Sequence, residues 1–151
     1  MSQIYKSLKI LCVAATKIEL EPLIRLLGNS RRYISAGDFR YRRDALEVDL
    51  LVTGIGIIPT IYHTTSQMRS GPYDLVLNVG IAGSFRSDWE PGMVVRVVEE
   101  AFGDMGVQKE TGYQTMFEAG FWKAHAVPFK KGKLVPLMDK RWLGGLEHLP
   151  E

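Results

Sequence analysis

Three short and mostly apolar runs constrain the fold of this chain more than any other feature of its sequence. They cover residues 9–15, 46–53 and 74–79, and each is followed directly by small or hydroxyl-bearing residues. Runs of this length, bounded by turn-forming residues, are typical of strands buried within a sheet. Helices are expected between them, over residues 17–27 and from 59 to about 68, so strands and helices alternate along the chain.

Shorter elements complete the expected order. Two more strands are predicted just before the second apolar run, at residues 33–36 and 39–43, and a further buried strand at residues 93–98. Residues 103–133 carry scattered glycines and aromatic residues without a sustained period. The predicted fold class is therefore α/β, a three-layer α/β/α sandwich around a mixed central sheet, in a single domain that spans residues 1–151.

The two expected helices each contain a proline. Pro59 suits the first position of its helix, where the missing N–H would have no partner in any case. Pro22 fits the earlier helix only if it lies near the first turn. Gly28-Asn29 is a typical end for that helix.

Composition and charge exclude several classes of protein. The 151 residues are 46% hydrophobic, and the net charge of +2 comes from charges of both signs. This balance argues against binding to nucleic acid or to an anionic membrane surface. No apolar run approaches the roughly 20 residues of a membrane helix, and residues 1–9 do not resemble a signal peptide. We expect a cytoplasmic protein whose single cysteine, Cys12, is buried and inert.

The carboxyl ends of the three apolar runs are the places where an open α/β sheet binds ligands. The first place holds Thr16-Lys-Ile-Glu19. This spacing fits a capping box, in which Thr16 begins the helix and Glu19 reaches back to its backbone N–H. Glu19 also fits a partly desolvated carboxylate that acts as a general base toward water. The residues alone leave both interpretations open.

The second and third places are rich in glycine. Thr53-Gly-Ile-Gly56 precedes a helix, so a ligand could approach the backbone closely, although a tight strand-to-helix turn explains the same residues. Pro59 stands where a dinucleotide fingerprint would need a third glycine. The stretch from Asn78 to Ser84 leaves room for a flat base or a ribose, or it packs closely against a neighbouring strand.

The other polar groups suggest no chemistry. His63, His125 and His148 have no metal-ligand spacing. Arginines and aromatic residues cluster over residues 31–43. We interpret this segment as a solvated hairpin face rather than a nucleic-acid surface.

Four segments, taken together and in order, resemble the nucleoside phosphorylase and nucleosidase superfamily. They are K-I-L-C-V-A-A-T-K-I-E at 9–19, V-T-G-I-G at 52–56, N-V-G-I-A-G at 78–83 and P-G-M-V-V at 91–95. Within it the sequence is most similar to the futalosine hydrolases of menaquinone biosynthesis. That similarity lies in A-A-T-x-x-E-x-x-P-L at 14–23, N-V-G-I-A-G-S-F at 78–85 and F-G-D-M-G at 102–106. The nucleosidase that cleaves methylthioadenosine and S-adenosylhomocysteine is the next most similar relative.

The resemblance implies a reaction, in which water attacks the anomeric carbon of an inosine-type nucleoside and hypoxanthine leaves. Glu19 is the carboxylate implied to orient the water. The residues implied to bind substrate are Thr53, Gly54, Gly56, Gly80, Ile81, Ala82, Gly83 and Phe102. The segment 14–17 lacks the glycine-rich phosphate loop of the phosphorylases, which favours water as the nucleophile. The resemblance implies no metal or organic cofactor, and a homo-oligomer in which a neighbouring subunit completes the pocket.

The sequence also departs from the pattern of the superfamily. Residues 111–151 contain no match to its ribose-binding Met-Glu pair or to its catalytic Asp, and Met93 stands where relatives commonly have Asp. We therefore expect a C-terminally truncated, partial version of the domain that lacks the general acid. Three interpretations remain: a futalosine-hydrolase-like enzyme whose remaining segment is absent, an inactive member that binds a nucleoside or a partner subunit, and an unrelated α/β binding domain.

Overall fold

The computed structural model describes residues 7–28, 31–35, 38–136 and 149–150. The chain divides into two compact units, residues 1–84 and residues 85–151. Each unit is described by itself below, and the expectation of a single domain stays a prediction.

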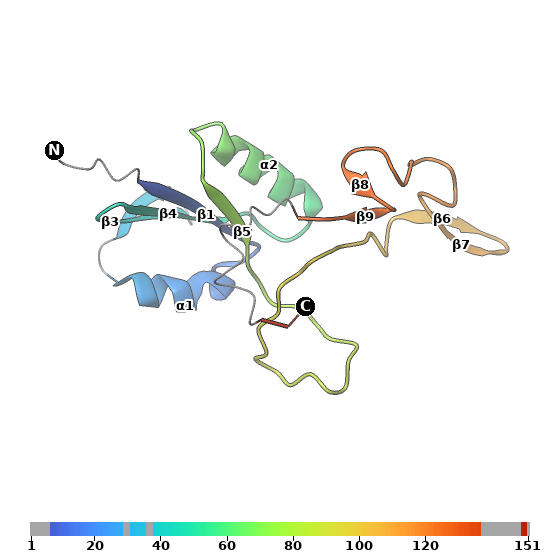
Figure 1. The fold of residues 1–151 in the computed structure, drawn as a ribbon, viewed down its shortest axis with the longest axis horizontal. Helices are drawn as coiled ribbons and strands as arrows, with labels where there is room; N and C mark the ends of the chain where they lie inside the picture. Colours follow the sequence, from blue (N-terminus) through green and yellow to red (C-terminus); the bar gives the residue numbers. More distant parts are fainter. Residues whose placement is uncertain (1–6, 29–30, 36–37, 137–148, 151) are drawn as a thin grey trace. The chain divides into compact units, whose positions relative to one another are not determined.

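A five-stranded mixed sheet forms the first unit (Figure 1). Its strand order is β2-β3-β4-β1-β5, with β1 parallel to both β4 and β5, whereas β2, β3 and β4 are antiparallel neighbours. The strands are β1 (Leu8–Ala14), β2 (Arg31–Ser35), β3 (Asp38–Arg43), β4 (Leu46–Val52) and β5 (Leu75–Asn78). The α/β class and the mixed sheet expected from the sequence are confirmed.

Helices α1 (Lys17–Leu27) and α2 (Ile57–Met68) lie on opposite faces of this sheet (Figure 1). The bounds of α1 match the prediction, but Pro22 lies in the second turn rather than the first. It is exposed there, so water can solvate the carbonyl that its missing N–H leaves free. The start of α2 was predicted two residues too late, since Pro59 is its third residue. The first four N–H groups of a helix lack partners, so proline is tolerated at that position as well.

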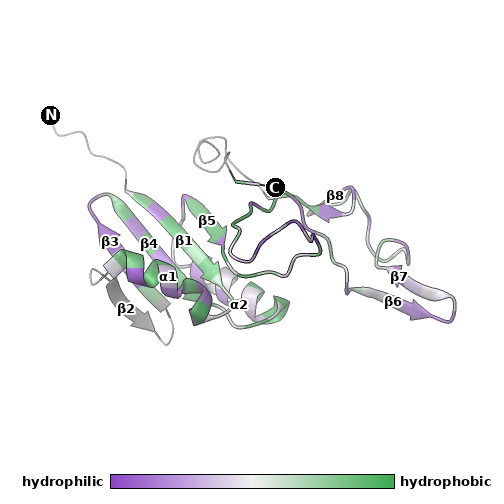
Figure 2. Cartoon of the chain, turned by 90° about the horizontal axis from the view of Figure 1, so that it is seen from below, coloured by the Kyte–Doolittle hydropathy of each residue, from purple (hydrophilic) through white to green (hydrophobic). Residues whose placement is uncertain are grey.

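The side chains of β1 alternate between two small cores, one on each face of the sheet. Cys12 and Ala14 pack with Leu20 and Ile24 of α1. Leu11 and Val13 pack on the other face with Leu51 and Tyr73. The side chain of Tyr73 is partly buried, and the others in these two cores that are named here are buried. Figure 2 shows that β1 and β5 consist mostly of hydrophobic residues. Cys12 is buried, as predicted. This burial raises the pKa of its thiol to about 11, so the thiol stays protonated at neutral pH.

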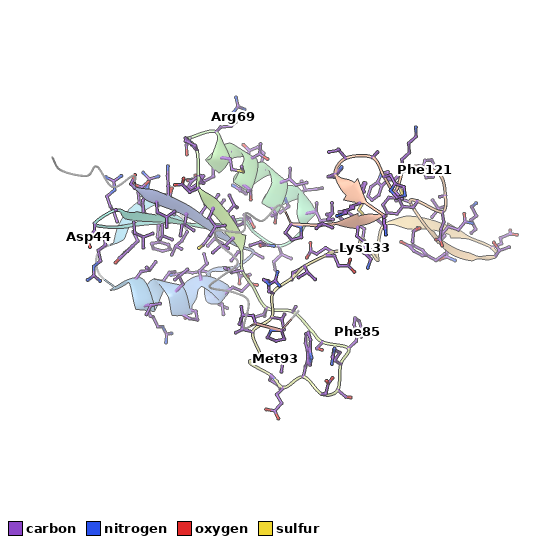
Figure 3. All side chains as sticks on the ribbon, in the orientation of Figure 1. Asp44, Arg69, Phe85, Met93, Phe121 and Lys133 are labelled. Atoms are coloured by element: carbon purple, nitrogen blue, oxygen red, sulfur yellow. The ribbon has the colours of Figure 1, made fainter. Side chains whose placement is uncertain are left out.

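The hairpin of β3 and β4 confirms the expectation of a solvated basic face only in part. Tyr41 is buried, and Phe39 packs partly buried against the same core as α1. On the opposite face the Arg42 guanidinium forms an ion pair with Glu47. Asp44, labelled in Figure 3, occupies the turn with a φ of 51°. Arg42 and Arg43 are exposed, as expected. Arg40 is only 32% exposed, because the acidic Asp49 stands opposite it in the register of the hairpin.

A buried carboxylate links this hairpin to α2. Asp49 is 2% exposed and accepts hydrogen bonds of 2.6 and 2.8 Å from the guanidinium of Arg40. The Tyr73 hydroxyl donates to it at 2.6 Å, and Gln67 of α2 donates to Tyr73 at 2.7 Å. Burial alone would raise the pKa of Asp49, but these hydrogen bonds and the nearby cations hold it below its usual value.

The second unit contains two short hairpins, β6 (Gly106–Lys109) with β7 (Gly112–Thr115) and β8 (Phe129–Lys130) with β9 (Lys133–Leu134). Both lie in or next to the stretch where the sequence showed no period. The strand predicted at residues 93–98 is absent from the described part of this unit. An apolar run becomes a strand only when a neighbouring strand pairs with its backbone, and Arg96 N–H bonds instead to the carbonyl of Pro150 at 2.9 Å.

Neither described helix has the length and apolar character needed to cross a membrane.

Candidate active site at the strand ends

The carboxyl ends of the three parallel strands meet at one edge of the sheet, as the sequence predicted. Thr53 N–H donates to the carbonyl of Ala14 at 2.9 Å, and Gly54 N–H donates to that of Ala15 at 3.0 Å. On the other side of β1, Val79 N–H donates to the carbonyl of Val13 at 2.9 Å. The three places expected from the sequence are therefore brought together by backbone hydrogen bonds.

Glu19 is the acidic side chain that connects two of these places. Its Oε2 accepts hydrogen bonds from the Thr16 N–H at 2.7 Å and from the Thr16 hydroxyl at 2.8 Å. Its Oε1 accepts a hydrogen bond from the Ile81 N–H at 3.2 Å. The capping box predicted for Thr16 and Glu19 is present. The same carboxylate also reaches the end of β5, so the two interpretations left open by the sequence are compatible.

The electrostatic surroundings of Glu19 favour its ionised form. The hydrogen bond from the Thr16 hydroxyl is the largest cause, and with that from the Ile81 N–H it holds the pKa of Glu19 below its usual value. Glu19 is only partly buried, and desolvation opposes this shift without reversing it. A carboxylate with a lowered pKa stays ionised at neutral pH, so its oxygens remain hydrogen-bond acceptors, but it takes up a proton poorly. The group is therefore suited to hold and orient a water molecule.

Gly80 makes room for this carboxylate. A Cβ atom added at position 80 would lie 2.8 Å from Oε1 of Glu19, which is closer than real Cβ contacts allow. The next residues, Ile81, Ala82 and Gly83, are all exposed, and a Cβ at Gly83 would meet no atom within 4 Å. The sequence predicted either room for a ligand or close packing here. The structure has close packing at Gly80 and open space at Gly83.

The turn from β4 into α2 depends on glycine for its backbone conformation. Gly54 and Gly56 have φ values of 88° and 102°, in a region that side chains disfavour. Thr53 is 3% exposed, and its hydroxyl lies 3.1 to 3.2 Å from the carbonyls of Ala14 and Gly54. The hydroxyls of Thr53 and Thr60 are also 3.2 Å apart. These contacts show a tight turn in which the hydroxyl of Thr53 forms hydrogen bonds to backbone carbonyls.

Sequence reasoning missed Thr60. Its hydroxyl donates to the Gly56 carbonyl at 2.8 Å and meets the buried Thr53 hydroxyl. The signal was available, because a threonine four residues after a helix start can bond back to a carbonyl one turn earlier. The effect of Thr60 is to close the first turn of α2 beside the strand ends.

Phe102, the last of the predicted substrate-binding residues, lies in the second unit. Its ring packs edge-to-face against those of Trp122 and Phe129, with ring centroids 5.4 and 6.4 Å apart. Phe117 completes this aromatic cluster. Within its own unit Phe102 is therefore a packing residue, and its role toward a substrate stays a prediction.

The described ranges contain no group of three or more His, Cys, Asp and Glu side chains arranged to hold a metal ion. His63 is exposed on α2, where its ring lies edge-on to Tyr62 at a centroid distance of 5.2 Å. The groups at the strand ends that could contact a ligand are a carboxylate, backbone N–H and C=O groups, and small side chains.

Comparison with known proteins supports this view of the fold. No family model matches the sequence. The chain is similar to the 5′-methylthioadenosine/S-adenosyl homocysteine nucleosidase of Helicobacter pylori, whose structure holds a pyrrolidinol ligand with an aminopyrrolopyrimidine group. The TM-score is 0.56 and the identity 21%, over 69% of this chain and 46% of the nucleosidase. The chain thus spans about half the length of that protein, and over the matched residues it has the fold of this nucleosidase.

Proposed function

We propose that this chain forms the part of a purine nucleosidase that orients the attacking water, with Glu19 as the carboxylate that holds it. The observation that supports the proposal most is the Glu19 carboxylate at the ends of β1 and β5, ionised and tied to both. The likeness to a nucleosidase fold agrees with it. Ligands of open α/β sheets bind at this edge, so we expect a nucleoside to bind beside the carboxylate.

The chemistry of N-glycosidic bonds suits such a carboxylate. When the bond breaks, its electron pair leaves with the purine, which takes up a proton, and the sugar becomes an oxocarbenium-like electrophile. The oxocarbenium-like carbon reacts readily with water. Correct placement of the water is therefore more important than its deprotonation. The oxygen of the water then bonds to the anomeric carbon and loses one proton, which balances the proton that the purine takes up. The lowered pKa of Glu19 fits the task of orientation.

The proposed substrate is futalosine, with release of hypoxanthine on the route to menaquinone. This rests on the segments at 14–23, 78–85 and 102–106, which resemble the futalosine hydrolases. We further propose that Thr53, Gly54, Gly56, Gly80, Ile81, Ala82, Gly83 and Phe102 contact the nucleoside, that the complete fold is a three-layer α/β/α sandwich, and that the protein is a cytoplasmic homo-oligomer.

A second candidate function is binding without hydrolysis, either of a nucleoside or of a partner subunit. The observation that favours it is the sequence of residues 111–151, which has no match to the Met-Glu pair and the catalytic Asp of the superfamily. A missing acid typically lowers a rate by a factor of about 10² to 10⁴. A protein of this kind would keep the strand-end site and lose turnover.

The experiment that separates these functions uses the purified full chain. Release of hypoxanthine from futalosine and of adenine from methylthioadenosine is followed by chromatography, and binding of both nucleosides by calorimetry. Hydrolysis of futalosine would support the first candidate. Binding without hydrolysis would support the second candidate, and a chain that neither binds nor cleaves either nucleoside would refute both.

A matched pair of variants tests the role of Glu19. Glu19→Gln should lower kcat by a factor of about 10² to 10⁴. Glu21→Gln, two residues along the same helix, removes a carboxylate on a side chain that is 44% exposed and whose partner is Arg25 at 3.0 Å. This variant should leave the rate unchanged. A wild-type rate in Glu19→Gln would refute the assigned role.

A further inference from the structure

The Glu19 carboxylate is held more firmly than a helix cap requires. A capping box needs one oxygen of the acidic side chain to accept the N-cap N–H. Here Oε2 does so, at 2.7 Å from Thr16 N, and it also accepts the Thr16 hydroxyl at 2.8 Å. Oε1 is bonded to a different segment, the Ile81 N–H at the end of β5. With its two oxygens bonded to separate segments, the carboxylate cannot rotate without breaking a hydrogen bond.

Gly80 sets how closely β5 can approach this carboxylate. The backbone of Gly80 has no positive φ, so its glycine is not explained by conformation. It is explained by space, because a Cβ there would stand 2.8 Å from Oε1 and 3.6 Å from Cδ of Glu19. The side chain of glutamate is flexible, but this one has three hydrogen bonds that any displacement would weaken.

We propose that Thr16 and Gly80 are positioning residues that fix the Glu19 carboxylate in the orientation in which it holds water. The proposal deepens the proposed function and rests on it where catalysis is concerned. Thr16 binds Oε2 from the β1–α1 turn, and Gly80 lets the Ile81 N–H bind Oε1 from β5. Oε1, whose hydrogen bond from the Ile81 N–H is longer than those that Oε2 accepts from Thr16, is the oxygen best able to accept a further hydrogen bond from water. The lowered pKa of Glu19 agrees with this arrangement.

The test begins with nuclear magnetic resonance, so that it does not depend on turnover. In the full chain labelled with ¹³C and ¹⁵N, the Glu19 carboxyl is titrated while the Ile81 amide is observed. Both signals should change at one midpoint, and that midpoint should lie below the range usual for glutamate. Gly80→Ala should uncouple the Ile81 amide from the titration and raise the midpoint. Gly83→Ala, in the same loop but with open space around its Cβ position, should leave the midpoint unchanged.

The role of Thr16 is tested by removing its hydroxyl and then restoring it. Thr16→Val removes the hydroxyl donor at similar volume and should raise the Glu19 midpoint, whereas Thr16→Ser keeps the hydroxyl and should restore it. Thermal melting shows whether each variant is folded. If Thr16→Val fails to fold, Gly80→Ala still decides the question, because position 80 lies outside the helix cap.

Kinetics then connect the positioning to catalysis. Gly80→Ala should lower kcat by a factor of about 10², the effect expected for a misplacement of about 1 Å, with KM for futalosine changed less than kcat. An unchanged titration and an Ile81 amide that still follows Glu19 in Gly80→Ala would overturn the positioning proposal. If the wild-type chain cleaves no nucleoside, the proposed function fails, yet the titration still decides whether Thr16 and Gly80 hold the carboxylate.

Discussion

Replacing Arg40 with leucine should leave the buried Asp49 carboxylate without its cation. Arg40→Leu removes hydrogen bonds of 2.6 and 2.8 Å to a side chain that is 2% exposed. Removing one partner of a buried ion pair costs about 3–5 kcal/mol. The side chain of Arg40 is itself 32% exposed, so we expect the lower end of that range, about 3 kcal/mol. For a chain of this length the melting temperature should fall on the order of 10 °C.

Urea unfolding followed by circular dichroism at pH 7 measures this loss. The midpoint should fall while the slope stays constant, because the surface exposed on unfolding is the same. Arg43→Leu is the matched control on the same strand. Arg43 is 75% exposed, and its acidic neighbour Asp44 is 91% exposed at 3.8 Å, so this variant should stay within about 0.5 kcal/mol of the wild type. Equal losses in the two variants would refute the reasoning.

The pH dependence of the Arg40→Leu variant gives a second check. In the wild type the pKa of Asp49 is depressed, so its contribution to stability is present above the unfolded pKa and is lost as the pH falls through the folded pKa. Without Arg40, burial dominates and the pKa of Asp49 should rise above its unfolded value. The folded variant then binds a proton that the unfolded chain does not, which helps it at low pH. The stability difference should therefore narrow between pH 7 and about pH 4, and a constant difference would contradict the assignment.

Three further changes test the core and the turns. Leu20→Ala, at a position with 0% exposure, should lower the free energy of unfolding by about 2–5 kcal/mol in urea unfolding. Its control, Leu26→Ala, lies on the same helix at 82% exposure and should lower it by less than about 0.5 kcal/mol. Gly54→Ala places a side chain at a φ of 88° and should cost about 1–2 kcal/mol in the same assay. Cys12, whose pKa is raised to about 11, should resist alkylation at pH 8 until urea unfolds the chain, and rapid alkylation of the native protein would contradict its burial.

The elements that sequence patterns predicted well are those fixed by local rules. The first strand and α1 were found because an apolar run ends directly at a capping box, Thr16 to Glu19. The strand-end site followed from topology, since parallel strands place their carboxyl ends at one edge. The hydrogen bond from the Ile81 N–H to Glu19 could not be predicted, because it joins segments that only the sheet brings together.

The errors have physical reasons that particular residues show. The run at 93–98 is apolar, but no pattern within it says whether a strand will pair with it. The turn between β8 and β9 was missed. Lys131 and Gly132 have positive φ values of 53° and 77°, as in a tight hairpin turn, but these angles are known only from the structure. The pairing of Arg40 with Asp49 was also within reach, because the turn at Asp44-Ala45 fixes the register that places them opposite each other.

The central position of β1 has a consequence for the order in which the chain folds. Leu8 pairs with Leu46 and Ile10 pairs with Leu75, so β1 is synthesised before both of its neighbours and gains them only after long loops have closed. The β3–β4 hairpin needs only a tight turn, and local contacts form faster than distant ones. We expect this hairpin to form first, β1 to dock beside it, and β5 to join last. Until β4 and β5 have both paired with it, the apolar strand β1 remains accessible to chaperones and to other unfolded chains.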